Sequence, residues 1–405
     1  MTRATDADGG GPGRVRWLLL AGVWLIYFCF GLSVASVAPL VTPISQELGI
    51  SNTLMGMILG AWPLVYIAAA LPAGILLDRI GVRMGLLLAS GVIATSLAAR
   101  GLAQEPWQLL LAVAIFGFGG PMISIGAPKT IARLFPGASR GMAMGLYMTG
   151  PSLGAIVSFS LTNSILMPLA GGEWRYVFAF HTAVVLVSGV IWLLLSSLPA
   201  VRNSGWNVEA GKKFNLPAFI DILRSGEVRL ILILAIGIFF FNHGLNNWLP
   251  EILRDRGFGA AQAGILAALP TAVGIMGALV IPRFATPSRR IGIMAALFGA
   301  ALVATGLLQA QAIELLLPGL VLQGIARSSM MAVAILLLMD ARGVPQDRLG
   351  LAGGLFFTFA EIGGVLGPLT IGLVSDLSGG FVLPLAMLTL VCAGLLGVVA
   401  RLARL

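Results

Sequence analysis

Charge is scarce in this sequence, and its scarcity excludes the commonest class of protein. Charged residues make up 10% of the 405 residues, whereas hydrophobic residues make up 58%. Soluble globular domains contain about 25% charged residues. The shortage therefore excludes an ordinary soluble domain and indicates an integral membrane protein.

Cysteine and histidine are almost absent as well. Cys29 and Cys392 both fall in apolar stretches, so neither a disulfide framework nor a thiol metal motif is expected. His181 and His243 are too few for a histidine-rich metal site. The sequence also lacks a Gly-rich phosphate-binding loop followed by Lys and Ser or Thr, which argues against ATP drive. No nucleophile–base pair is apparent, so we expect neither an enzyme nor a cofactor.

What the chain does contain is a series of apolar stretches, each near 20 residues or longer, from Trp17 to the C-terminus. Each can cross a hydrocarbon core of roughly 30 Å. We predict an all-α membrane protein in which a tail, 1–16, is disordered and the first span is retained rather than cleaved as a signal peptide. The twelve expected spans are 17–40, 53–77, 84–103, 107–132, 141–166, 176–198, 229–250, 262–283, 290–312, 314–339, 349–374 and 380–402.

The basic residues are distributed unevenly about these spans. A net charge of +9 could indicate a nucleic-acid partner. If the N-terminus is cytoplasmic, however, most of the 25 Lys and Arg residues fall on the cytoplasmic side. This is the positive-inside pattern of membrane proteins. It predicts that both termini are cytoplasmic and that nucleic acid is not a partner.

The chain also carries a weak internal repeat. The longest polar stretch, 199–228, is expected to be a cytoplasmic linker between two six-helix bundles, 17–198 and 229–402. Residues 141–149 match 350–358, and 83–85 match 290–292, at a nearly constant separation. Parallel repeats of this kind place the substrate site at their interface, near the middle of the membrane.

One loop carries a specific motif. Residues 74–86 read Gly-Ile-Leu-Leu-Asp-Arg-Ile-Gly-Val-Arg-Met-Gly-Leu. This resembles the loop signature of the major facilitator superfamily, and with the spans, linker and repeat the resemblance covers the whole chain. It implies the major facilitator fold, with 12 transmembrane helices in two six-helix pseudo-symmetric bundles. Residues 119–129 and 239–253 further resemble the cyanate permease and nitroimidazole transporter branch.

The motif predicts a cytoplasmic gate made of Asp78, Arg79 and Arg83. Asp78 at a helix end can pair with basic residues and with the positive N-terminal end of a helix from the other half. Breaking that contact would let the halves rock. The alternative is a generic loop that only sets topology.

Two charges lie near the middle of apolar stretches, Arg327 and Glu361. Such a charge costs on the order of 2.5–3.5 kcal/mol on insertion scales, so it usually faces a partner, a polar cavity or a substrate. A guanidinium suits a carboxylate or small planar anion. Arg327 could instead be structural, paired with Glu361. Glu361 could carry a proton, or serve as the fixed counter-ion of Arg327.

The seventh expected span is unusually polar. Asn242 and Asn246 form one i,i+4 pair, and His243 and Asn247 form another. In the superfamily, spans 1, 4, 7 and 10 line the central cavity. The resemblance therefore implies a substrate site built from Arg327, Asn242, His243, Asn246, Asn247, Gln323 and Tyr27. The alternative for the span-seven cluster is hydrogen bonding between helices.

Together these features predict a secondary active transporter of a small organic or inorganic anion, similar to a monocarboxylate or cyanate. We expect alternating access, proton coupling, and a monomer in the lipid bilayer of a bacterial inner membrane. The alternative function is a proton-antiport exporter of amphipathic drugs or metabolites. A third possibility is a membrane sensor that transports nothing.

Overall fold

The computed structural model describes residues 12–135, 137, 139–198, 216–345 and 348–405, and every element among them is helical. The first half contains α1 (Pro12–Ala35), η1 (Ala38–Leu40), α2 (Val41–Leu48), α3 (Asn52–Leu102), α4 (Pro106–Leu134), α5 (Ser139–Leu161), a π-helical turn η2 (Thr162–Leu166), α6 (Met167–Leu169) and α7 (Trp174–Ser196). The second half contains α9 (Leu216–Arg224), α10 (Gly226–Asp255), α11 (Ala260–Phe284), α12 (Arg290–Leu307), α13 (Ile313–Asp340), α14 (Leu349–Ser378) and α15 (Val382–Leu402).

Helix α3 accounts for two of the predicted spans. Among the described residues, 11 helices are long and apolar enough to cross a membrane, and α3 alone has 51 residues. Gly81 interrupts it with φ 78° and ψ 159°, a conformation that suits only glycine. The Leu77 side chain packs against Gly85, so the chain turns here. The predicted all-α fold with twelve spans is confirmed.

Short polar signals set the helix ends. The Ser51 hydroxyl accepts a hydrogen bond from the Leu54 backbone N–H and caps the start of α3. Gly379, with φ 71°, ends α14 in the left-handed conformation typical of a C-terminal glycine.

Two predicted boundaries need correction. The predicted tail, 1–16, is too long, because α1 begins at Pro12; residues 1–11 lie outside the described structure. The predicted linker, 199–228, contains helix α9 and the start of α10, while 199–215 lie outside the described residues. The sequence of α9, Leu-Pro-Ala-Phe-Ile-Asp-Ile-Leu-Arg, is mostly apolar within a stretch that looks polar overall.

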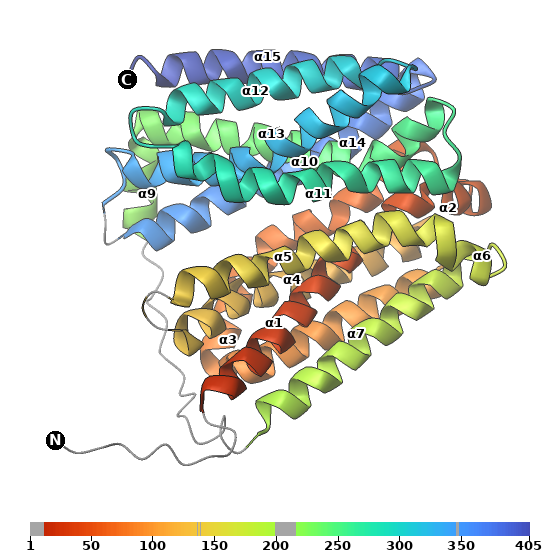
Figure 1. Cartoon of the computed structure of the whole chain (residues 1–405), viewed down its shortest axis with the longest axis horizontal. Coiled ribbons are helices and arrows are strands. Elements are labelled where there is room, and N and C mark those ends of the chain that lie inside the picture. The colour runs from red at the N-terminus through yellow and green to blue at the C-terminus, as the bar shows by residue number, and fades with distance from the viewer. Residues whose placement is uncertain (1–11, 136, 138, 199–215, 346–347) are drawn as a thin grey trace.

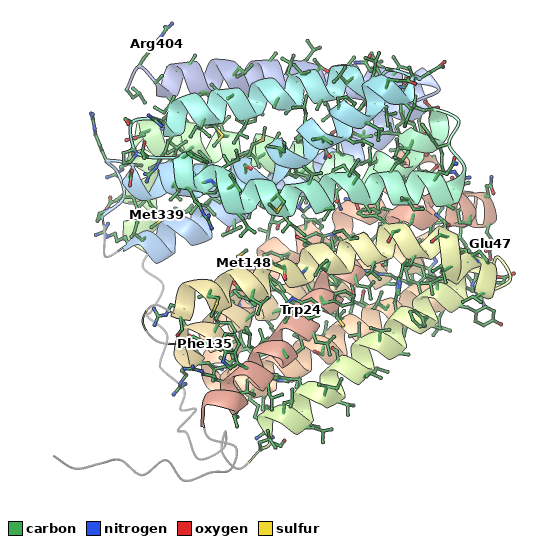
Figure 2. All side chains as sticks on the ribbon, in the orientation of Figure 1. Trp24, Glu47, Phe135, Met148, Met339 and Arg404 are labelled. Carbon is green, nitrogen blue, oxygen red and sulfur yellow. The ribbon has the colours of Figure 1, made fainter. Side chains whose placement is uncertain are left out.

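The two halves lie side by side with their helices roughly parallel (Figure 1). We call the end that carries α9 and the C-terminus the linker end, and the end that carries α2 and α6 the distal end. Arg404 marks the linker end and Glu47 the distal end in Figure 2. Side chains fill the spaces between neighbouring helices of each half, as the same view shows.

Close packing between the halves occurs where α3 meets α14. Gly56 lies against the backbone of Pro368, and Gly60 against the carbonyl of Val365. Further toward the distal end, Gly372 of α14 lies against the Asn52 carbonyl. Small residues let two helix backbones approach closely in a membrane. These glycines therefore belong to the interface rather than to either half alone.

A carboxylate ties the halves at the distal end. Asp376, near the end of α14, accepts hydrogen bonds from the backbone N–H groups of Asn52 at 3.0 Å and Thr53 at 2.7 Å. The Thr53 hydroxyl donates to the same carboxylate at 2.6 Å. An anion at a helix N-terminus is stabilised by the helix dipole and by unpaired N–H groups. A second tie runs from the Thr42 hydroxyl to Glu251 at 2.6 Å.

Removing the charge of Asp376 should loosen this end. We expect Asp376→Asn to weaken the tie by roughly 1 kcal/mol, because the carboxylate caps the start of α3 at a partly exposed site. Hydrogen exchange at the backbone of residues 52–56 should then be faster in the variant than in the wild type. Asp255→Asn, also at the distal end but within the second half, is the matched control. Equal rates of hydrogen exchange at residues 52–56 in all three proteins would show that Asp376 does not hold the halves together.

Candidate functional site

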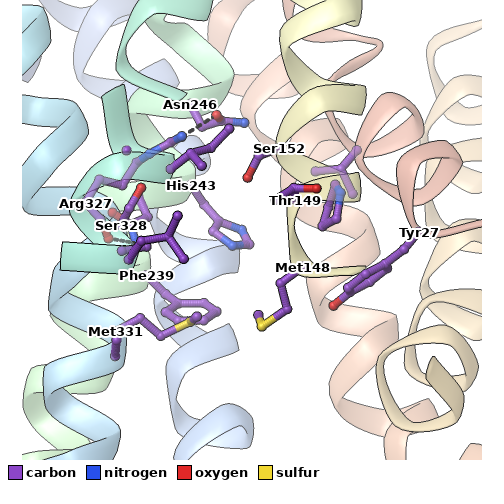
Figure 3. Close-up of a pocket in the computed structure, with 18 of the residues that line it drawn as sticks. Tyr27, Met148, Thr149, Ser152, Phe239, His243, Asn246, Arg327, Ser328 and Met331 are labelled. Atoms are coloured by element: carbon purple, nitrogen blue, oxygen red, sulfur yellow. Dashed lines mark hydrogen bonds between the residues drawn. The ribbon is translucent and has the colours of Figure 1, made fainter. Parts of the chain in front are cut away.

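A cavity of about 500 Å³ lies between the halves (Figure 3). Helices α1 and α5 of the first half form one wall, and α10, α11 and α13 of the second half form the other. The wall of the second half carries most of the strongly polar groups. Six of the predicted site residues line the cavity: Tyr27, Asn242, His243, Asn246, Asn247 and Arg327.

Arg327, on α13, is held in the cavity wall by neutral groups. One terminal nitrogen donates to the Asn246 side-chain oxygen at 2.5 Å, and the other to the Thr271 hydroxyl at 2.8 Å. The Asn242 amide donates to the backbone carbonyl of Arg327 at 3.3 Å. A guanidinium has five N–H donors. These contacts fix its plane and leave donors for a bound molecule.

The charge of Arg327 is not neutralised by a neighbouring acid. Within the described part of the chain, Arg327 forms no salt bridge. Glu361, on α14, is only 5% exposed and does not line the cavity. Its Oε2 atom has no hydrogen-bond partner among the described residues. The interpretation of Glu361 as a fixed counter-ion of Arg327 is therefore wrong for this conformation.

His243, on α10, is stacked with two aromatic rings. Its ring centroid lies 5.2 Å from that of Phe239 and 5.4 Å from that of Trp62. Trp62 belongs to α3, so this stack joins the two halves. Glu361 lies close by: a Cβ placed on Gly364 would be 2.7 Å from Glu361 Oε2 and 2.9 Å from His243 Nδ1. Glycine at this position leaves room for both side chains.

The opposite wall offers an aromatic ring and hydroxyl groups but no charge. Tyr27 is stacked on Tyr147, with ring centroids 5.5 Å apart. The Thr149 hydroxyl accepts from the Trp24 indole at 3.0 Å. Ser152 and Met148 complete this wall, and Figure 3 shows them facing Arg327 and His243 across the cavity.

Gln323 does not line the cavity, contrary to the prediction. It is on α13, one turn before Arg327, but its side chain is fully buried and does not line the cavity. Neighbouring Gly324 lies directly against the backbone of Pro270 on α11. The two helices come together there and close the cavity, so the shared helical face carries Gln323 into the interior of the second half.

Sequence reasoning missed the cavity residues Ser328, Thr149 and Ser152, and it missed Thr271, which accepts a hydrogen bond from Arg327. Isolated Ser and Thr residues are frequent in membrane helices, where they bond to their own backbone or to a neighbouring helix. Thr271 is not part of any sequence motif. Only the knowledge that α11 packs closely against α13 would have connected Thr271 to Arg327.

The predicted gate residues are engaged within their own half. Asp78 forms a salt bridge of 2.7 Å with Lys129 on α4. Arg83 donates to Ser196 at 3.2 Å and to Ser197 at 2.6 Å, both at the end of α7. Arg79 is exposed. These polar contacts of Asp78 and Arg83 thus stay in the first half, and a gating role across the halves remains a prediction.

Comparison with known proteins gives the family. Residues 23–313 match the model of the Major Facilitator Superfamily. The chain belongs to this superfamily. It is 23% identical to the Quinolone resistance transporter of Acinetobacter baumannii over 402 residues, covering 93% of this chain and 91% of the relative. It is 24% identical to the Hexuronate transporter of Bacillus subtilis, covering 91% and 88%.

A third relative is the Gallate transporter of Pseudomonas putida, 26% identical and covering 77% of this chain and 76% of the relative. The solved structure of the nucleoside transporter NupG superposes with a TM-score of 0.81 at 14% identity, covering 96% of this chain and 99% of that one. This likeness shows the shared fold. The relatives do not single out the cyanate and nitroimidazole branch, so the resemblance holds at the level of the superfamily.

The Thr271 contact can be tested without knowing a ligand. Thr271→Val keeps the shape but removes the acceptor of an N–H group of Arg327. We expect a loss of roughly 1–2 kcal/mol of unfolding free energy, because a bond to a charged group is lost. A lowered thermal midpoint in detergent would show it. Thr271→Ser keeps the hydroxyl and should behave like the wild type; equal stability of the Val and Ser variants would contradict the geometry.

Proposed function

We propose that this protein is a secondary active transporter of a small organic anion, coupled to protons. The observation that carries the proposal is Arg327, an un-neutralised cation in a cavity between the two halves. A guanidinium binds a carboxylate through two parallel hydrogen bonds. The neutral partners Asn246 and Thr271 orient the cation without cancelling its charge.

The proposed substrate class is an organic carboxylate that also carries polar groups. Pockets of about 300–1,000 Å³ suit organic molecules, and the cavity of about 500 Å³ is far larger than a triatomic anion such as cyanate needs. Asn242, Asn247 and Ser152 can exchange hydrogen bonds with hydroxyl groups. Two relatives, named for transport of hexuronate and gallate, support this class.

The positions of the contacts between the halves support a mechanism of alternating access. The ties of Asp376 and Glu251 close the distal end, whereas the gate residues at the linker end bond within their own half. We assign the linker end to the cytoplasm of a bacterial inner membrane, so both termini are cytoplasmic and this conformation faces inward. In the opposite conformation, Asp78 would leave Lys129 and contact the other half, while Asp376 would release α3.

Proton coupling is assigned to Glu361. It is a buried carboxyl group without a hydrogen-bond partner for Oε2 among the described residues, and no cation of the described chain forms a salt bridge with it. A carboxyl group in this environment is stable when it is neutral, and it releases its proton when water or a cation reaches it. We propose that the protein works as a monomer in the lipid bilayer, with protons and the anion as its partners.

A second candidate function is an exporter of amphipathic compounds by proton antiport. Phe239, Met148 and Met331 give the cavity an apolar part, and one relative is named for quinolone resistance. The two candidates differ in their need for Arg327. An exporter of neutral or cationic compounds would tolerate its loss, whereas an anion carrier would not.

Arg327→Gln tests the proposed function. We expect a loss of at least tenfold in affinity for small organic carboxylates, because about 1.5–3 kcal/mol of charge-assisted hydrogen bonding disappears. The measurement is a thermal-shift series on purified protein with mono- and dicarboxylates, sugar acids, aromatic acids and exported drugs. Binding to the folded state raises the midpoint, so even millimolar binders register at high concentration.

Arg401→Gln, an exposed arginine at the end of α15, is the matched control and should keep full binding. A carboxylate that stabilises the wild type and Arg327→Gln equally would contradict the anion proposal. The exporter would be favoured if a drug raised the thermal midpoint of both the wild type and Arg327→Gln while no carboxylate raised that of the wild type.

A further inference from the structure

Glu361 is buried next to His243, whose side chain lines the cavity between the halves. Glu361 is 5% exposed and Trp62 is 6% exposed, while His243 lines the cavity. The His243 ring is stacked with the Phe239 ring at an interplanar angle of 26° and with the Trp62 ring at 28°. We call these three rings the occluding stack. Gly364 packs against both His243 and the Glu361 carboxyl, which places the acid next to the stack.

We propose that the occluding stack seals Glu361 from the cavity, and that rocking of the halves opens and closes this seal. The proposal rests on the proton role of Glu361 given above. It assigns a positioning function to Trp62, which touches neither substrate nor proton in this scheme. Trp62 acts by holding His243 in place over the acid.

The stack can respond to rocking because Trp62 belongs to the first half, whereas Phe239 and His243 belong to the second. Phe239 and His243 are one turn apart on α10 and move together. Trp62 is on α3, where its ring also packs edge-on against Phe116 at 5.5 Å and Tyr66 at 6.1 Å. These contacts fix Trp62 to the first half. Any rotation of one half against the other must therefore shift Trp62 relative to His243.

The surroundings of Glu361 explain why such a seal matters. Helix α14 packs against α3, α9, α10, α13 and α15. The titratable groups that these helices bring toward the middle of the bundle are Tyr66 of α3, His243 of α10, Arg327 of α13 and Cys392 of α15. The charged groups of α9 and Arg401 of α15 lie at the linker end. In the proposed scheme the stack also keeps Glu361 from Arg327, the cation among the described residues that line the cavity.

The consequence is controlled proton exchange. With the stack closed, Glu361 keeps the proton it bound from water on one side. When Trp62 moves away, His243 is released, water reaches the carboxyl group, and the same proton leaves as hydronium. No bond other than O–H is made or broken. Without the seal, the carboxyl group could exchange protons with each side of the membrane in turn. Protons would then cross the membrane without substrate.

The test is a proton-leak measurement in proteoliposomes that contain a pH-sensitive dye, with a pH gradient imposed and no substrate present. Trp62→Ala should raise the leak at least fivefold over the wild type. The double variant Trp62→Ala with Glu361→Gln should return the leak to the wild-type rate, because the path through the acid is gone. Trp62→Phe keeps a ring on His243 and should stay sealed.

Trp107→Ala, an exposed tryptophan at the start of α4, is the matched control and should not leak. Trp62→Leu fills more of the vacated space and replaces Trp62→Ala if the latter does not yield a monodisperse protein. A folded Trp62→Ala or Trp62→Leu variant that leaks no faster than the wild type overturns the proposal. So does a leak that persists in the double variant.

The result of the leak measurement does not depend on whether the protein transports an organic anion. The leak is measured without substrate, and carboxylate binding to the Trp62 variants is followed separately by thermal shift. If carboxylates fail to bind the wild type, the proposed function fails while the leak result still decides the role of the stack. If carboxylates bind normally and no Trp62 variant leaks, only the stack proposal fails.

Discussion

The uncancelled charge of Arg327 is the constraint on which the rest of the site depends. A cation in the middle of a membrane protein is costly unless polar groups or an anion stabilise it. The chain provides two neutral acceptors, Asn246 and Thr271, from two other helices of the same half. They orient the guanidinium but leave its charge in place. A site arranged in this way is completed by an anion from outside, which is the physical basis of the proposed transport activity.

The two halves contribute to this site unequally. The second half supplies the cation and the amides, with the buried acid close by, whereas the first half supplies an aromatic ring and hydroxyls. Their close contact runs along α3 and α14, where glycines bring the backbones together and Asp376 caps α3. The occluding stack joins α3 to α10, and Glu361 of α14 lies next to it. One interface therefore combines the closure of the distal end with the isolation of Glu361.

Much of this organisation could be predicted from the sequence, for identifiable reasons. Apolar stretches of membrane length gave the spans, and the i,i+4 spacing of the span-seven amides placed Asn242 and Asn246 on the cavity side. Gln323 was predicted wrongly because helical spacing identifies a face of the helix but not how far along the helix the cavity extends. The separation of Glu361 from Arg327 depends on how α10, α13 and α14 pack, and one chain's residue pattern does not contain that packing. Trp62 showed no signal because its role arises from contact with the other half.

The most direct test of the account is an experimental structure of the protein with a bound organic carboxylate that stabilises it. The account predicts the carboxylate in the cavity between the halves, with both oxygens within hydrogen-bond distance of the Arg327 guanidinium and with Asn246 and Thr271 still bound to it. A carboxylate located elsewhere, or an Arg327 turned away to pair with Glu361 while the ligand is bound, would contradict it.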